Sequence, residues 1–202
     1  MRLVLATVLA LAAAPLLAQQ APKGPPGAPD PSRVVAGTYK VDTGHTQVLF
    51  TYLHLGFTEY TGQFTQPTGS LVLDPKNPAN DKVEITFPIS KVATTVAGLN
   101  EHFQKPEIFD SAKYPDAKFS STSVTVHGTT ATIVGNLTIK DVTKPITLEA
   151  RFIGAGASMG GKPYVGFAAT GTLNRSDYHL GFLVPMVADK VDLTINAGFV
   201  QE

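Results

Sequence analysis

Apolar and polar residues alternate with a period of two along most of this chain. In residues 47–55, Val48, Phe50 and Tyr52 fall on one side of the pattern, while Leu49, Thr51 and Leu53 fall on the other. Successive side chains of a β-strand point to opposite faces, so this period predicts strands with two distinct faces. Clear alternation also marks residues 82–89, 146–152, 165–173 and 191–199. Further strands are expected over residues 36–42, 62–73, 118–127 and 130–139.

The links between most of these segments are short. His127-Gly128-Thr129 has the composition of a tight turn, and Lys140-Asp141 is a second candidate because Asp tolerates left-handed backbone angles. Parallel neighbours would need crossovers of a dozen residues or more, so short links indicate antiparallel order. Eight or nine strands then form an all-β fold, either a sandwich or a closed barrel. A barrel would remove exposed sheet edges.

Residues 94–112 break the alternation. Apolar residues recur there at helical spacing, at Val96, Leu99 and Phe103. Pro106 is expected to end that helix, and residues 107–112 are expected to form a second short helical turn. A helical insertion between two barrel strands would lie across an open end. It would carry to the rim His102, Phe103, Ile108 and Phe109.

The N-terminal residues predict export. Arg2 precedes an apolar run, and small residues at Ala12, Ala14 and Ala18 offer cleavage sites, so residues 1–18 are interpreted as a signal peptide. The run is shorter than the ~20 residues of a membrane-spanning helix. Residues 19–33 contain five Pro and two Gly, which predicts a disordered tether before one domain over residues 34–202. We expect a periplasmic or secreted protein.

Composition excludes several classes of function. The chain has no Cys, which rules out disulfides and thiol chemistry. It has 16 basic and 16 acidic residues and no long basic run, so nucleic acid is not an expected partner. The five His show no short metal-ligand spacing. We therefore expect neither a metal nor a cofactor.

A series of motifs runs in order across residues 39–199. The motifs are Tyr39-Lys-Val-Asp42 with His45, His54-Leu55-Gly56, Asn100-Glu101-His102-Phe103, Tyr114-Pro115-Asp116-Ala117-Lys118-Phe119, Gly135-Asn136-Leu137-Thr138-Ile139 and Arg175-Ser176-Asp177-Tyr178. Each motif is weak alone, but the ordered series resembles the YceI-like, polyisoprenoid-binding domain family. Four positions depart from the family pattern: Glu101 stands where the family commonly has Asp, Phe103 where it has Leu, and Asp141 and His179 where it usually has Gly. We expect the last two residues to affect turn geometry.

The resemblance implies an antiparallel eight-stranded barrel of lipocalin type, with a short helical segment near its mouth. It implies that the interior holds a long amphiphilic lipid, such as a polyisoprenoid or an isoprenoid quinone, for storage or transport. It also implies a bacterial periplasmic or secreted protein, often dimeric, with no established catalysis. A homodimer through the hairpin at residues 153–163 and transient membrane contact are expected on this basis.

Candidate binding residues follow from placing the aromatic residues inside such a barrel and the polar residues at its mouth. Small residues at Ala150, Ala169 and Gly171 would leave room for a ligand. The predicted apolar tunnel is walled by Phe50, Tyr52, Phe57, Phe64, Phe87, Leu99, Phe103, Phe109, Phe119 and Phe167. The predicted head-group site at the mouth comprises Asp42, His45, Asn100, His102, Arg175, Asp177 and Tyr178.

Two other functions fit the same barrel. One is a lipid-acting enzyme with His45 or His102 as general base, which would require a nucleophile or acid within hydrogen-bond reach. The other is a structural secreted domain whose interior is filled by its own side chains. An interior packed with Phe and Leu would favour the structural domain, whereas a hollow interior would favour ligand binding.

Overall fold

The computed structural model describes residues 24–202. The expected signal peptide and the first five residues of the expected tether lie outside this range. The strands are β1 (Gly37–Val41), β2 (Gln47–His54), β3 (Thr58–Phe64), β4 (Thr68–Leu73), β5 (Lys82–Pro88), β6 (Val92–Ala93), β7 (Asp116–His127), β8 (Thr130–Ile139), β9 (Val142–Ala157), β10 (Pro163–Asn174) and β11 (Lys190–Gln201). Helix α1 spans Ala97–Phe103, and 3-10 turns occupy Pro31–Arg33, Pro78–Asn80, Ile89–Lys91 and Arg175–Tyr178.

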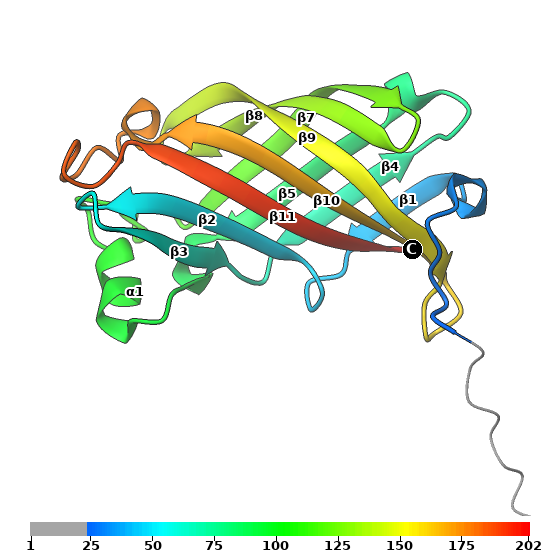
Figure 1. Ribbon diagram of the computed structural model, residues 1–202, viewed down its shortest axis with the longest axis horizontal. Coiled ribbons are helices and arrows are strands. Elements are labelled where there is room, and N and C mark those ends of the chain that lie inside the picture. Colours follow the sequence, from blue (N-terminus) through cyan, green and yellow to red (C-terminus); the bar gives the residue numbers. More distant parts are fainter. Residues whose placement is uncertain (1–23) are drawn as a thin grey trace, which may run out of the picture.

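Eight strands close into an antiparallel barrel. Their order is β1-β4-β5-β7-β8-β9-β10-β11, and β11 pairs back with β1. A short break separates β1 from β2, and another separates β3 from β4. Strand β11 therefore pairs with β1 near its end and with β2 near its start. Figure 1 shows the long strands crossing the molecule obliquely, with α1 at one end. The prediction of an all-β, eight-stranded antiparallel barrel is confirmed.

The period-two pattern identifies the inward face of the barrel. Val48 and Phe50 on β2 are buried, as are Ile146 and Leu148 on β9. The alternate positions carry the polar residues, such as Thr147 and Glu149, which are exposed. The barrel therefore folds as its alternation dictates, because register in a strand fixes which residues reach the core.

The helical segment is shorter than expected and lies deeper. Helix α1 ends at Phe103, and residues 107–112 form turns rather than a second helix. The N–H of Phe109 donates to the carbonyl of Phe103 across 3.2 Å, which folds the chain back. Phe103 and Phe109 are both buried in the core rather than held at the rim. The reason is the large apolar area of two aromatic rings, which is best removed from water.

The expected tether is not disordered over residues 26–33. Ala28 forms a β-bridge to Ala155 on β9, with N–H to carbonyl hydrogen bonds of 3.0 and 2.9 Å. The chain can approach so closely because Gly156 has no side chain, and a Cβ there would overlap the carbonyl of Pro26. This segment therefore packs on the outside of the barrel.

Several turns use left-handed backbone angles, including those at three positions singled out in the sequence. Gly128 has φ of 64°, as expected for the turn between β7 and β8. In the turn after β8 the left-handed residue is Lys140, with φ of 56°, and not Asp141. His179 also adopts this conformation, with φ of 57°, at a point where glycine would do so more readily.

Candidate ligand-binding interior

The interior of the barrel is hollow and holds two adjoining cavities. The first, here called the inner cavity, has a volume of about 220 Å³ and lies between the barrel strands. The second, here called the mouth chamber, has a volume of about 330 Å³ and lies at the end that carries α1. Both cavities are lined by Phe64, Ile139, Leu173 and Leu193. The shared wall makes them two parts of one elongated interior.

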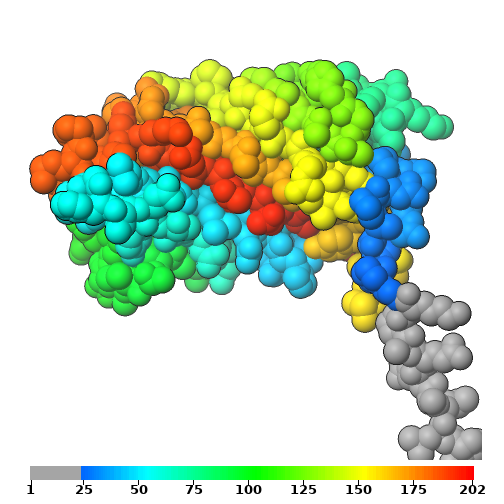
Figure 2. Space-filling view, viewed as in Figure 1, coloured from blue at the N-terminus to red at the C-terminus, as the bar shows by residue number. Residues whose placement is uncertain are grey.

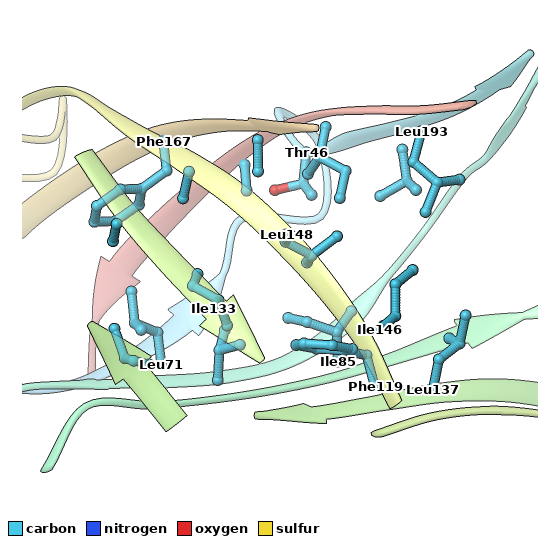
Figure 3. Close-up of a pocket in the computed structure, with 18 of the residues that line it drawn as sticks. Thr46, Leu71, Ile85, Phe119, Ile133, Leu137, Ile146, Leu148, Phe167 and Leu193 are labelled. Carbon is cyan, nitrogen blue, oxygen red and sulfur yellow. The ribbon is translucent and has the colours of Figure 1, made fainter. Parts of the chain in front are cut away.

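The inner cavity is almost wholly apolar. Figure 3 shows Leu71, Ile133, Leu148 and other aliphatic side chains arranged around it. The hydroxyl of Thr46 also lines it, but this group donates to the carbonyl of Gly198 at 3.2 Å. A molecule in this cavity would therefore be held by contact with hydrocarbon and not by hydrogen bonds.

Small residues keep the inner cavity open. A barrel of eight strands is just wide enough to be filled by its own side chains. Here Ala150, Ala169 and Ala197 line the space, so part of it stays empty. The ring of Phe119 lies directly over Gly135, where a Cβ would overlap it. That glycine lets the ring lie flat against the wall instead of projecting inward.

The mouth chamber is enclosed largely by aromatic rings. Phe50 meets Phe103 of α1 edge to face, with ring centroids 5.9 Å apart. Phe64 meets Phe109 in the same way at 5.8 Å. Edge-to-face pairs are a favourable arrangement for aromatic rings. The helix and the turns after it are therefore fixed to the barrel strands by ring contacts.

Polar groups reach the mouth chamber from one side. They belong to Tyr52, His54, Tyr60, His102 and Arg175. The hydroxyl of Tyr60 is buried and has no hydrogen-bond partner among the described residues. Burial, and secondarily the neighbouring Tyr60, raises the pKa of Tyr52, so Tyr52 keeps its proton and can act as a donor. A buried hydroxyl without a partner destabilises a protein, which marks Tyr60 as a group that a ligand could satisfy.

Arg175 supports the loop that covers the chamber. Its Nε donates to the carbonyl of Ala188 at 2.9 Å, and its Nη2 donates to that of Val187 at 2.9 Å. Nη1 donates to the carbonyls of Leu180 at 2.6 Å and Phe182 at 3.4 Å. These four bonds use four of the five N–H groups of a guanidinium.

The charge of Arg175 persists beside the chamber. Burial lowers the pKa of Arg175, and the nearby Asp189 and Tyr52 oppose that lowering. An arginine does not lose its proton in a protein, so the positive charge remains. Arg175 thus combines a structural task with one free N–H donor and a charge at the chamber wall.

Nine of the ten residues predicted for the apolar tunnel line one of the cavities. The inner cavity contacts Phe87, Phe119 and Phe167, while Phe64 contacts both spaces. The mouth chamber is further lined by Phe50, Tyr52, Leu99, Phe103 and Phe109. The exception is Phe57, which lies in the turn between β2 and β3 with 86% of its surface exposed. A hairpin turn projects beyond the barrel, so its side chain cannot reach the interior.

The seven predicted head-group residues do not form one cluster. His102 and Arg175 line the mouth chamber. Tyr178 is buried in the core, and Asn100 accepts hydrogen bonds from Thr94 instead of facing the chamber. Asp177 forms an ion pair with Lys144 at 2.6 Å. These three residues support the end of the barrel and do not line the cavity.

Asp42 and His45 lie away from the chamber altogether. They occupy the break between β1 and β2, where Asp42 pairs with His45 at 2.8 Å and accepts from the Tyr164 hydroxyl at 3.0 Å. The N–H of Asp42 donates to Gly198, near the end of β11, whereas Arg175 lies beside the start of β11. Residue pattern alone does not indicate which end of the barrel this break approaches.

Sequence reasoning missed two parts of the chamber. Tyr60, Gly62 and Phe64 occupy alternate positions of the same strand and therefore share a face. Extending the strand back from Phe64 with a period of two would have placed Tyr60 inside the barrel. The loop that contributes Leu180, Phe182, Leu183 and Val187 has no regular period and offered no such signal.

Residues 24–202 contain neither a cluster of metal-ligating side chains nor a membrane-spanning helix. No three His, Cys, Asp or Glu side chains gather closely enough there to hold a metal ion. No helix in that range has the length and apolar character needed to cross a membrane.

Comparison with known proteins identifies the family. A family model described as the YceI-like domain matches residues 39–199. Protein YceI of Escherichia coli O157:H7 is 38% identical over 170 residues, which is 83% of this chain and 89% of that protein. The chain belongs to the YceI-like family. The resemblance found in its motifs is thereby confirmed.

Several solved structures share the fold. BcnA of Burkholderia cenocepacia matches with a TM-score of 0.71 at 21% identity, over 78% of this chain and 98% of that one. The YceI protein of Campylobacter jejuni matches with a TM-score of 0.65 at 26% identity, over 74% and 90%. A domain from Saccharophagus degradans, described as polyisoprenoid-binding, matches with a TM-score of 0.63 at 12% identity, over 81% and 98%.

Proposed function

We propose that this YceI-like barrel binds one long amphiphilic lipid, a polyisoprenoid or an isoprenoid quinone. The tail would occupy the inner cavity, and the head group would lie in the mouth chamber. One observation carries this proposal: the interior holds two adjoining cavities that share four lining residues, and the one at the mouth has the more polar lining. An amphiphile has the same asymmetry, with hydrocarbon along its length and polar atoms at one end.

The volumes suggest a chain length. A cavity of about 150 Å³ can hold benzene, which corresponds to roughly 25 Å³ per carbon atom. At that ratio the inner cavity of about 220 Å³ holds ~9 carbons and the mouth chamber of about 330 Å³ holds ~13. Together they hold ~22 non-hydrogen atoms, which must include both the tail and the head group. With the head group in the mouth chamber, ~9 tail carbons, or about two isoprene units, lie in the inner cavity.

Two donors are suited to the head group. The free N–H of Arg175 and the unpaired hydroxyl of Tyr60 both belong to the wall of the mouth chamber. A quinone carbonyl or a phosphate oxygen accepts hydrogen bonds and would satisfy them. His102 lines the same chamber and is a third candidate, although its Nε2 already lies 3.1 Å from Glu107.

The comparisons support this ligand class. The similar domain from Saccharophagus degradans is described as polyisoprenoid-binding. We further propose that the protein is exported by its N-terminal signal peptide and works in the periplasm or outside the cell, where it stores or transports its lipid. In this proposal it acts as a binding protein and not as an enzyme.

The alternatives receive less support from the geometry. A structural domain would have a filled barrel, whereas this one contains two cavities. For an enzyme with His45 as base, the ring would have to face the interior, but His45 lies in the strand break and lines neither cavity. His102 does line the mouth chamber, but the carboxylate beside it, Glu107 at 3.1 Å, lines neither cavity.

Native mass spectrometry of the protein purified from its host tests the proposal, followed by organic extraction of the same sample. We expect one lipid per chain, and the extract should contain a polyprenyl or quinone compound. Delipidated protein serves as the control and should regain the same mass on addition of a polyprenyl phosphate or a quinone. If neither purified nor reloaded protein carries a lipid, the proposed function is wrong.

A further inference from the structure

An exposed apolar surface adjoins the mouth chamber. Six of the twelve large hydrophobic residues that are exposed among residues 24–202 lie in two loops, residues 53–57 and 180–187. They are Leu53, Leu55, Phe57, Phe182, Leu183 and Met186, and we call them the apolar rim. Hydrophobic residues scattered singly over a surface need no explanation, but a cluster of this kind marks an interaction site.

The two loops form one platform. The N–H of Leu55 donates to the carbonyl of Met186 at 3.1 Å, and the N–H of Ala188 donates to that of Leu53 at 3.0 Å. Figure 1 and Figure 2 show the hairpin after β2, in cyan, beside the orange to red segment before β11, at the end opposite residue 24. The exposed side chains are therefore held together by backbone hydrogen bonds and do not depend on a partner to assemble.

The apolar rim is continuous with the interior. Phe182 and Leu183 line the mouth chamber, and both are also exposed to solvent. Phe57 and Met186 extend the surface outward and are 86% and 62% exposed. An apolar path thus leads from the outermost side chains into the chamber.

The two loops contain no charged residue. Neither residues 53–57 nor residues 180–187 include Asp, Glu, Lys or Arg, and His54 is their only titratable side chain. A surface that met another protein in water would usually carry a polar rim, and one that met anionic lipid head groups would carry Lys or Arg. An uncharged apolar projection suits insertion into the acyl region of a bilayer.

We infer that the apolar rim docks on a lipid bilayer and places the mouth chamber directly against its acyl chains. This inference rests on the proposed function, because a polyisoprenoid is stored in membranes and is insoluble in water. Docking would let the lipid pass between bilayer and barrel without exposing its tail. The rim would bind zwitterionic phosphatidylcholine bilayers, and salt would have little effect because the rim carries no charge.

Single-cysteine labelling tests the docking itself. The chain has no Cys, so Phe57→Cys and Met159→Cys each give one site for an environment-sensitive nitrobenzoxadiazole label. Met159 is a matched control, because it is also apolar and 96% exposed but lies in the β9–β10 loop at the other end of the barrel. With phosphatidylcholine vesicles, we expect a blue shift and quenching by doxyl lipids at position 57 only. Equal responses at both positions, or none at either, would overturn the inference.

The same label distinguishes a bilayer from a second copy of the chain. If two copies met through the apolar rim, the position-57 label would shift with protein concentration in the absence of vesicles. Without vesicles, we expect the emission of the label to stay constant at protein concentrations up to those used in the vesicle experiment. A concentration-dependent shift without a vesicle response would assign the rim to a dimer and overturn the inference.

Transfer kinetics test the consequence of docking. Phe57→Ser with Met186→Ser changes two rim residues that line neither cavity. We expect the transfer of a quinone between phosphatidylcholine vesicles to slow by about tenfold or more, because burial of a large apolar side chain is lost. The double variant should keep its affinity for detergent-dispersed quinone. Met159→Ser should change neither the transfer rate nor that affinity. An unaltered transfer rate in the double variant would overturn the inference. If no variant binds quinone at all, the proposed function fails, while the labelling result stands separately.

Discussion

The inner cavity and the mouth chamber differ in what encloses them. The inner cavity is bounded almost entirely by strand residues, and its lining is apolar except for Thr46, Asp81 and Lys82. The mouth chamber is bounded by the ends of strands, by α1 and by the loop before β11, and five polar side chains reach it. The strands thus enclose a cavity with few polar groups. The helix and the loop enclose the chamber whose polar groups can distinguish one head group from another.

This difference has an energetic basis. Strand backbone is satisfied by neighbouring strands, so the inner cavity needs no polar side chains in its wall. The loop over residues 180–188 has unpaired carbonyl groups, and Arg175 satisfies four of them. A polar group is thus required at the mouth to fold the loop, and it is then available to a ligand.

The largest expected effect comes from filling the inner cavity. In Ala169→Phe the added ring would occupy most of about 220 Å³, because its six additional carbon atoms need ~150 Å³. A long tail would lose burial of ~6 carbons at ~0.8 kcal/mol each, or roughly 5 kcal/mol, so affinity for a polyprenyl ligand should fall about 1,000-fold or more. Isothermal titration with ligands of different tail length measures this loss.

Ala168→Phe is the matched control, because Ala168 is the preceding residue on β10 and lines neither cavity. It should retain the affinity of the original protein. A ligand whose tail is short enough for the mouth chamber alone should bind Ala169→Phe as well as it binds the original protein. If Ala169→Phe also lost affinity for the short-tailed ligand, the tail and the head group would not occupy separate cavities.

Two glycines allow the cavity walls to be compared directly. A Cβ at Gly135 would overlap the ring of Phe119 at the inner cavity, and a Cβ at Gly62 would overlap the ring of Phe50 at the mouth chamber. At Gly135 the backbone carbonyl of Ser120 is also only 2.7 Å from that position, and backbone cannot move aside easily. We expect Gly135→Ala to destabilise the fold by about 3 kcal/mol and Gly62→Ala by about 1 kcal/mol.

Urea denaturation of both variants measures these losses. Which variant loses more stability matters more than the size of either loss. A larger loss for Gly135→Ala would mean that the wall of the inner cavity accommodates an added methyl group less easily than the wall of the mouth chamber. Equal losses, or a larger loss for Gly62→Ala, would show that the mouth chamber is packed as rigidly as the inner cavity.

The sequence predicted the inner cavity better than the mouth chamber. Placing aromatic residues inside a barrel selected Phe87, Phe119 and Phe167, and this worked because a strand has only two faces. Short links supplied the antiparallel order, while the choice of a barrel over a sandwich came from the family resemblance. Whether the barrel would be hollow could not be read from the pattern, because that depends on the sum of side-chain volumes across all strands.

The mouth chamber depends on contacts that no local period encodes. The turns after α1 carry Phe109 inward through a hydrogen bond to Phe103, a result of tertiary packing rather than propensity. Asp42 and Arg175 both follow short strand-like segments, yet they lie near opposite ends of β11. Residue type alone predicted a polar mouth, but it could not select which polar residues reach it.

A smaller effect is expected for Tyr60→Phe, which should stabilise the fold but weaken ligand binding. The variant removes a buried hydroxyl that has no partner in the empty chamber, so the free energy of unfolding should rise by about 1 kcal/mol. If a ligand oxygen accepts from that hydroxyl, affinity for a quinone should fall by roughly tenfold. Tyr52→Phe serves as a comparison in the same chamber. Unchanged affinity in Tyr60→Phe would remove Tyr60 from the head-group site.

The smallest effect concerns two carboxylates, one near each end of β11. Asp189 accepts hydrogen bonds from the N–H and the hydroxyl of Ser176 at 2.7 and 2.6 Å, beside the chamber. Burial pushes the pKa of Asp189 upward, but the bonds from Ser176 and the charge of Arg175 outweigh it and leave the pKa below its ordinary value. The pKa of Asp42 is also below its ordinary value. Burial alone would raise it, but the hydrogen bonds from His45 and Tyr164 outweigh that effect.

A lowered pKa stabilises the fold at pH values above the ordinary carboxyl pKa of about 4, and this contribution disappears as the pH falls through the lowered value. At pH 7, Asp189→Asn and Asp42→Asn should each lower the free energy of unfolding by about 1 kcal/mol, and the difference from the original protein should shrink toward pH 3. Only Asp189→Asn should also speed release of a bound quinone, because only Asp189 supports the segment that Arg175 holds over the chamber. Equal release rates in the two variants would mean that the covering loop does not retain the ligand, and retention would then rest on the apolar tail in the inner cavity alone.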